Sequence, residues 1–235
     1  MKKRTKWMVV ALVAGMLMAA GCEKHSILEG TIVDAKDRPI SGLRVIADMV
    51  QPVKGYEHFE TKTDPGGRFS FKTFYPSSDY LISVQHKNWR SDAVAHVTAG
   101  PEGRMVKLEK PIQILFGVSD DGVITDFITG LEWMAGPDDD TTWDAAKAWC
   151  SNLSVAGGGW RMPNRAELKA LYDNGFGKKR LASIFKTTVW GVWSGEQFES
   201  SKAGQFRFQG GIEGWTTRSP EISSYGRAMA VRSPK

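Results

Sequence analysis

The sequence has little of the residue types that carry most catalytic and metal chemistry. Only two cysteines and four histidines occur among its 235 residues, and no histidine follows His96. A Ser/His triad or a His-ligated metal therefore cannot lie wholly within residues 97–235. The glycine spacing of a nucleophile elbow is also missing around Ser194. We expect a chain that is not an enzyme and that uses no cofactor.

The apolar stretch near the N-terminus is too short to be a permanent membrane-spanning helix. It covers residues 7–20, whereas a span needs roughly 20 apolar residues. Basic residues precede this stretch and small residues follow it, which is typical of a secretory signal. We therefore predict a signal peptide over residues 1–21.

Cys22 stands at the predicted cleavage point. The segment AAGC at residues 19–22 resembles the bacterial lipoprotein box, although Ala19 stands where the box usually has leucine. The resemblance implies a lipoprotein whose Cys22 carries fatty acyl chains such as palmitate and begins a short tether over residues 22–26. Glu23, in place of aspartate, implies the outer membrane, with the protein facing the periplasm or the outside. Ordinary signal cleavage that leaves Cys22 unmodified is the alternative.

Loss of the signal peptide would remove most of the apparent positive charge. The whole chain has 31 basic and 26 acidic residues, and four of the basic residues lie within residues 1–21. The mature chain would therefore carry 27 basic against 26 acidic residues. Nucleic-acid binding needs a basic surface, and no nucleic-acid motif occurs in the sequence, so we expect no nucleic-acid partner.

Residues 27–110 alternate apolar and polar residues over short segments separated by turns. The clearest segments are LRVIADMV at 43–50, RFSF at 68–71 and YLISVQH at 80–86. This pattern predicts a small antiparallel β-sandwich. The stretches GTIVDAKDRPISGLRVIA and TKTDPGGRFSFKTFYPSSDYLISV resemble the carboxypeptidase regulatory-like domain, a transthyretin-like or Ig-like sandwich. The resemblance implies a spacer or interaction module without catalytic residues.

A short junction over residues 111–116 leads into a second region, residues 117–235, that is rich in tryptophan and glycine. Helices are predicted where Thr141 stands three residues before Asp144 and where Asn164 stands three before Glu167, because such pairs form capping boxes. Short strands are expected within residues 122–128, 131–134, 191–196, 205–209 and 227–233. Helices combined with an irregular antiparallel sheet predict an α+β domain.

The order of motifs in residues 117–235 is similar to that of the Lcl C-terminal domain-like family. The central motif is WRMP at 160–163 followed by EL at 167–168. The resemblance implies a C-type-lectin-like fold of bacterial surface and secreted proteins, some of which are adhesins that bind sulfated polysaccharides. Relatives often pair a cysteine on the first helix with one in the last strand, whereas here Cys150 matches the first and Ala230 stands near the second. We therefore expect Cys150 to be a buried, unreactive thiol.

Tryptophans and arginines within residues 186–227 indicate a ligand-binding surface. Exposed tryptophans stack on sugar rings, and arginine holds sulfate or carboxylate groups with paired hydrogen bonds. The candidates are Trp190, Trp193, Trp215, Arg207, Arg218 and Arg227. Burial in the core is the alternative for these tryptophans, and it is the expectation for Trp143, Trp149 and Trp160.

Four aspartates gather at the start of the first predicted helix: Asp138, Asp139, Asp140 and Asp144. Lectins of the broad fold implied above often hold calcium with carboxylates, but this spacing is not that of the DxDxDG loop. Carboxylates before a helix are also favoured by the helix dipole. We therefore expect structural charges and no metal, with calcium as the alternative.

These observations predict a non-enzymatic envelope lipoprotein attached to the membrane through a lipid on Cys22. In the first interpretation, its C-terminal domain acts in recognition or adhesion by binding a polysaccharide or another envelope component. In the alternative, the protein is a structural subunit that docks another envelope protein.

Overall fold

The computed structural model describes residues 25–173, 184–185, 191–218 and 226–234. The chain divides between Ile114 and Leu115 into two compact units, which we call the N-terminal and the C-terminal unit. The predicted signal peptide and Cys22 lie outside the described residues. Within the described ranges, no helix has the length and apolarity needed to cross a bilayer.

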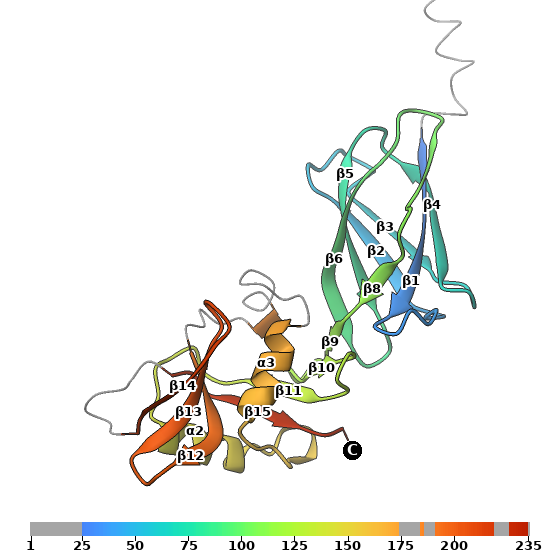
Figure 1. The fold of residues 1–235 in the computed structure, drawn as a ribbon. Helices are drawn as coiled ribbons and strands as arrows, with labels where there is room; N and C mark the ends of the chain where they lie inside the picture. The colour runs from blue at the N-terminus through green and yellow to red at the C-terminus, as the bar shows by residue number, and fades with distance from the viewer. Residues whose placement is uncertain (1–24, 174–183, 186–190, 219–225, 235) are drawn as a thin grey trace, which may run out of the picture. The chain divides into compact units, whose positions relative to one another are not determined.

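The N-terminal unit consists of two β-sheets (Figure 1). In the first sheet the order is β4-β1-β7, and β8 pairs with the last residues of β1. Its strands are β1 (Ser26–Asp34), β4 (Arg68–Phe74), β7 (Met105–Lys107) and β8 (Ile112–Ile114). The order β6-β5-β2-β3 describes the second sheet. It contains β2 (Arg44–Met49), β3 (His58–Lys62), β5 (Asp79–Gln85) and β6 (Arg90–Thr98).

Alternating burial along the strands agrees with the faces predicted from the sequence. Leu43 and Val45 are fully buried, and so are Tyr80 and Ile82. Phe74 of β4 stacks on Tyr80 of β5 with ring centroids 3.9 Å apart. Because these two strands belong to different sheets, the stacked rings join the two sheets across the core. The period-two pattern therefore locates this core correctly.

The C-terminal unit contains two antiparallel sheets and two α-helices within the described residues (Figure 1). Strands β9 (Phe116–Val118), β10 (Ile124–Asp126), β11 (Glu132–Ala135) and β15 (Met229–Arg232) pair in that order. The second sheet has the order β12-β13-β14, with β12 (Val192–Phe198), β13 (Lys202–Arg207) and β14 (Ile212–Thr217). The helices are α2 (Trp143–Asn152) and α3 (Arg165–Asp173). All five predicted strands form, whereas β9 and β14 were not predicted.

The WRMP motif builds the start of α3. The Asn164 side chain accepts a hydrogen bond from the Glu167 amide at 2.7 Å, and the Glu167 carboxylate accepts one from the Asn164 amide at 2.8 Å. This reciprocal pair is the predicted capping box. Arg161 adds two hydrogen bonds of 2.8 and 2.6 Å to the same carboxylate. The most specific motif in the sequence therefore has a structural role.

The first helix starts one residue later than predicted. Thr142, not Thr141, is the N-cap, and its side chain accepts a hydrogen bond from the Ala145 amide. The helix buries Trp143, Ala146 and Cys150, whereas Trp149, which was expected in the core, is half-buried. Threonine is a preferred N-cap residue, and a threonine does cap this helix. Because Thr141 and Thr142 are adjacent, the sequence alone did not show which of the two is the cap.

Cys150 is buried, as predicted, and burial raises the pKa of its thiol to about 12. We expect it to resist a thiol-reactive dye at pH 8 in the native Cys22→Ser chain, because only about one thiol in ten thousand would be ionised there. Unfolding in guanidinium should restore stoichiometric labelling. Rapid labelling of the native chain would show that this position is accessible.

His58 on β3 lies between two carboxylates on the surface of the second sheet. Its Nδ1 is 2.6 Å from Asp48 Oδ1 and its Nε2 is 3.0 Å from Glu60 Oε1. The hydrogen bonds that His58 donates to Asp48, the larger effect, and to Glu60 raise the pKa of His58 above its usual 6.5. The imidazolium therefore stabilises the fold fully below pH 6.5, and this contribution is lost as the pH rises through the raised pKa.

We expect an NMR titration of His58 to give a pKa above 6.5 and expect Asp48→Asn to bring it back toward that value. The stability difference between wild type and this variant should be largest in mildly acidic buffer and should shrink on the alkaline side. A His58 pKa that is the same in both chains would contradict the pairing with Asp48.

Candidate functional site

Trp193, one of the predicted ligand-binding residues, is a core residue. Its side chain is fully buried, and its Nε1 donates a hydrogen bond to the Thr141 carbonyl at 2.7 Å. Gly226 approaches this indole so closely that a side chain at that position would overlap it. The prediction that Trp193 contacts a ligand is therefore wrong. Trp190 lies outside the described residues.

Trp215, in contrast, is exposed on β14 and lies beside a second exposed aromatic ring. Trp215 is 40% exposed and Phe198, at the end of β12, is 48% exposed. Their ring centroids are 5.5 Å apart, and the ring planes are inclined by 41°. Lys202 lies across the hairpin, with its Nζ 5.9 Å from the centroid of the Phe198 ring. The two rings thus form one continuous apolar surface with a cation at its edge.

Arg165, the first residue of α3, extends this aromatic surface. Its Cζ lies 4.1 Å from the centroid of the Trp215 ring, which is a cation–π contact. Its Nε donates to Glu196 Oε2 at 2.7 Å. Neither of its Nη groups has a hydrogen-bond partner among the described residues. We call Arg165, Phe198 and Trp215 the aromatic platform.

Gly204 and Glu196 hold the platform together. Gly204 pairs with Trp215 across the sheet, and a Cβ atom there would lie 3.2 Å from Arg165 Cδ. Such an atom would also overlap Ser194 Oγ, which donates a hydrogen bond to Glu196 Oε2 at 3.1 Å, so the missing side chain leaves space for Ser194 and for the close approach of Arg165. Burial disfavours the charged form of Glu196, but hydrogen bonds from the side chain and backbone of Arg165 and from Ser194 outweigh burial and lower its pKa. The carboxylate thus stays ionised and fixes the guanidinium over the indole.

The three arginines predicted to bind a ligand do not join the platform. Arg207 is exposed, but it pairs with Ile212 across the sheet, and alternation along β13 places it on the face opposite Gly204 and Trp215. Arg218 forms an ion pair with Asp144, and its Cζ lies 4.3 Å from the centroid of the buried Trp143 ring. Arg218 therefore covers the buried ring of Trp143.

Arg227 is paired with the acidic segment before α2. Its Nε lies 3.1 Å from Asp138 Oδ1, and its Nη1 contacts Asp140. The Arg227 side chain is only 14% exposed. With Asp144 paired to Arg218, three of the four calcium candidates are engaged by guanidinium groups, whereas no ion pair involves Asp139 within the described part of the chain. This arrangement does not fit a calcium site, and no cluster of metal-binding side chains occurs among the described residues.

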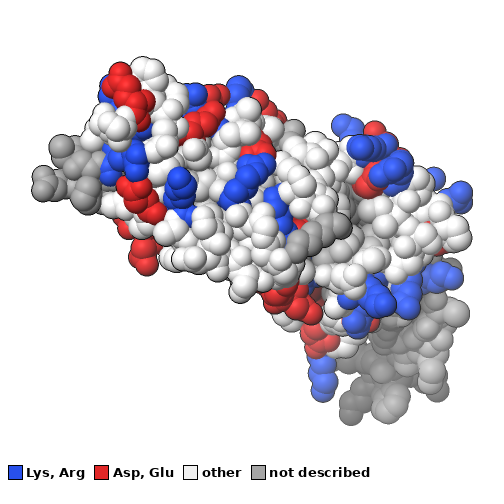
Figure 2. Space-filling model, turned by 90° about the horizontal axis from the view of Figure 1, so that it is seen from below, with Lys and Arg blue, Asp and Glu red and all other residues white. Residues whose placement is uncertain are grey.

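Paired charges are a general feature of the C-terminal unit. Figure 2 shows Lys and Arg side chains next to Asp and Glu side chains at several places on the visible face. The pairs in this unit that involve arginine are Arg161–Glu167, Arg165–Glu196, Arg218–Asp144, Arg227–Asp138, Arg227–Asp140 and Arg232–Glu132. These arginines therefore act first as structural cations, and among them Arg165 combines pairing with contact to an exposed aromatic ring.

Sequence reasoning missed two of the three platform residues. Arg165 directly follows the WRMP-Asn segment and stands in the first turn of a helix. A cation at that place is unfavourable for the helix dipole, so its position was a signal that could have marked it as a candidate site residue. Phe198 and Lys202 flank a tight hairpin in which Glu199 has a positive φ of 56°. No local pattern shows that this hairpin lies beside the start of α3.

The comparison with protein families finds a match within the C-terminal unit. A sequence model of the Lcl C-terminal domain matches residues 122–232. No curated protein matches the chain.

Two solved structures are similar at low identity. One is the Yersinia pseudotuberculosis adhesin InvE, with 12% identity, a TM-score of 0.32, and coverage of 88% of this chain and 60% of the adhesin chain. The other is a 9R-lipoxygenase from Cyanothece PCC8801, with 8% identity, a TM-score of 0.24, and coverage of 90% and 42%. The chain therefore spans about 60% of the adhesin's length.

We expect Arg227→Gln to lower the free energy of unfolding by about 1–2 kcal/mol, between the values for exposed and buried pairs, because Asp138 and Asp140 lose their cation. Millimolar calcium should then raise the melting temperature of this variant by binding the carboxylates that Arg227 no longer contacts. Arg207→Gln is the matched control, since Arg207 has no carboxylate partner among the described residues. An equal calcium effect on the wild-type chain would contradict the arginine-paired arrangement.

Proposed function

We propose that the C-terminal unit is a non-enzymatic recognition domain in a surface or adhesion role and that it binds saccharides through the aromatic platform. The single observation behind this proposal is the contact of Arg165 with the exposed ring of Trp215, with both Nη groups of Arg165 left unpaired among the described residues. The match of residues 122–232 to the Lcl C-terminal domain supports a role in recognition.

The chemistry of the platform suits a sugar that carries an acidic group. The apolar face of a pyranose ring can pack on Phe198 and Trp215, since aromatic rings supply apolar area at little entropic cost. A sulfate or carboxylate on the same sugar would accept hydrogen bonds from the free Nη groups of Arg165. Because Glu196 already fixes this guanidinium, little side-chain entropy would be lost on binding.

The protonation states near the platform support a non-catalytic role. The pKa values of both Glu167 and Glu196 are lowered, since hydrogen bonds from Arg161 and Arg165 outweigh the effect of burial. These carboxylates therefore remain ionised near neutral pH and are poor proton donors. We assign both a positioning role.

We propose a location in the cell envelope for this recognition unit, and features of the sequence support it. The predicted signal peptide and the lipoprotein-like segment at Cys22 support a lipid anchor in the outer membrane. The N-terminal unit, which resembles the carboxypeptidase regulatory-like domain in sequence, would then act as a spacer between the anchor and the recognition unit.

A docking subunit is the second candidate function, and the open edge of β14 favours it. Within the described residues β14 pairs with β13 alone, and Ile212 at its start is 58% exposed. An exposed strand edge can accept a strand from a partner protein. In this case the partner would contact backbone groups of β14 and would depend little on the ring of Trp215.

The decisive test is binding of the chain to immobilised polysaccharides, including sulfated and carboxylated ones, for wild type, Trp215→Ala and Arg165→Lys. We expect Trp215→Ala to weaken binding about tenfold or more, which corresponds to about 1.4 kcal/mol. Arg165→Lys keeps the charge but loses the planar guanidinium, so it should weaken binding to acidic sugars more than to neutral sugars.

Tyr75→Ala is the matched control, because Tyr75 is a 39% exposed aromatic residue of the N-terminal unit. Melting curves should show that each variant folds. Equal binding by wild type and a folded Trp215→Ala chain would refute the platform as the saccharide site. No binding to any polysaccharide, together with capture of an envelope protein, would favour the docking subunit.

A further inference from the structure

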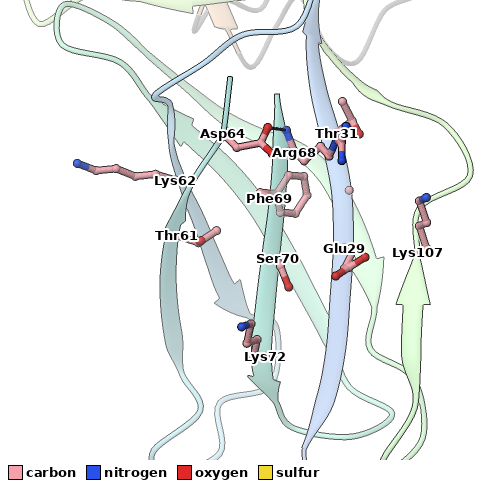
Figure 3. Close-up of a pocket in the computed structure, with 11 residues that line it drawn as sticks. Glu29, Thr31, Thr61, Lys62, Asp64, Arg68, Phe69, Ser70, Lys72 and Lys107 are labelled. Carbon is pink, nitrogen blue, oxygen red and sulfur yellow. Dashed lines mark hydrogen bonds between the residues drawn. The ribbon is translucent and has the colours of Figure 1, made fainter. Parts of the chain in front are cut away.

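The N-terminal unit has a hollow on the outer face of its first sheet. The hollow has a volume of about 580 Å³, and residues of β1, β3, β4 and β7 line it. Figure 3 shows four basic side chains around it, with Arg68 near one end of β4, Lys72 near the other end, Lys62 on one side and Lys107 on the opposite side. We call these four residues the basic rim.

The cations of the basic rim have no acidic partners. None of the four forms an ion pair with any residue in the described part of the chain. Two other arginines of this unit differ, since Arg38 is paired with Asp34 and Arg44 with Glu60. Unpaired like charges around one depression raise the local positive potential, which attracts anions.

Two carboxylates also line the hollow, but they do not neutralise it. Asp64 is tied to its own turn, because its Oδ1 accepts hydrogen bonds from the amides of Gly66 and Arg68 at 2.8 and 2.9 Å. Glu29 lies between the basic side chains, and in the strand pairing it faces both Ser70 and Lys107. Four cations against two carboxylates leave the lining with a net charge of about +2.

Ser70 lies on β4 between Arg68 and Lys72 and also lines the hollow. Its Oγ is buried and has no hydrogen-bond partner among the described residues. The register pairs Ser70 with Glu29 at the centre of the strands that line the hollow. Because this oxygen is buried, an anion in the hollow would meet the surrounding ammonium groups and not the hydroxyl.

We propose that this hollow binds a phosphomonoester group. Such a group carries close to two negative charges at neutral pH and three acceptor oxygens, which matches the net charge of the lining. Lys72 and Lys107 donate to the phosphate oxygens, and Arg68 and Lys62 add to the positive potential of the hollow. Glu29 weakens the interaction by repulsion, so it limits affinity. The proposal concerns the N-terminal unit and does not rest on saccharide binding by the C-terminal unit.

The test uses the full chain in a neutral detergent at low ionic strength. Two probes share the phosphomonoester group but differ in source: glycerol phosphate as a free ester, and phosphatidic acid in mixed micelles as a lipid headgroup. Binding is measured by two-dimensional NMR and by titration calorimetry. Lys72→Gln/Lys107→Gln should weaken binding about 10- to 30-fold, which is about fivefold per charge at contact distance in water.

Glu29→Gln should strengthen binding about fivefold, because it removes one repelling charge. Lys36→Gln/Lys87→Gln is the matched control, since both lysines are exposed in the same unit and neither lines the hollow. Binding of glycerol phosphate with this pattern of variants supports the site and a free ester as its source. Binding of phosphatidic acid alone with the same pattern supports the site and a lipid source.

Two results would overturn the proposal. One is the lack of binding to either probe by the folded wild-type chain. The other is binding that the rim variants and the Lys36/Lys87 control weaken equally, since this would indicate general attraction to a charged surface.

Discussion

The carboxylate of Glu167 is the contact on which the geometry of the C-terminal unit depends. It accepts hydrogen bonds from Arg161 before α3 and from the amide of Asn164 at its cap, so it fixes both where the helix begins and how the chain enters it. Arg165 directly follows Asn164 and is the first residue of α3. Its contact with Trp215 requires that α3 begin at this point. The sequence motif and the platform are therefore adjacent: the first supplies rigidity, and the second supplies a surface that a ligand can reach.

The sequence predicts the elements of the fold well wherever their pattern is local. In the N-terminal unit, period-two alternation identified the buried faces that contain Leu43, Val45, Tyr80 and Ile82. In the C-terminal unit the Asn164–Glu167 capping box marked the start of α3 correctly, because both partners lie within one helical turn. Prediction failed for β14, whose sequence IEGWTT has a glycine and no apolar alternation. That strand forms because it pairs along its whole length with β13, which is a tertiary effect.

The candidate site was harder to predict, because its parts come from three elements. Trp193 and Trp215 have similar glycine-rich surroundings in the sequence, yet one is fully buried and the other is exposed. A register shift between Trp193 and Gln197 changes which residues of β12 face the core, and such a bulge leaves no clear local signal. Arg218 and Arg227 resembled ligand-binding cations only because their partners, Asp144 and Asp138, lie far away in the sequence. Without those partners, a structural cation and a ligand-binding cation look alike.

The pairing of β1 has a consequence for how the N-terminal unit forms. This first strand is joined in parallel by β7 and β8, so that Ile27 lies opposite Met105 and Ile32 opposite Ile112. A parallel pair cannot form from a tight hairpin, and closing so long a loop carries an entropic cost before any contact repays it. The first sheet therefore cannot be completed until nearly all of the unit is present, and its folding should be slow compared with that of a unit built from local hairpins. A chain that emerges from its N-terminus would keep β1 without its parallel partners until the end of the unit has followed it.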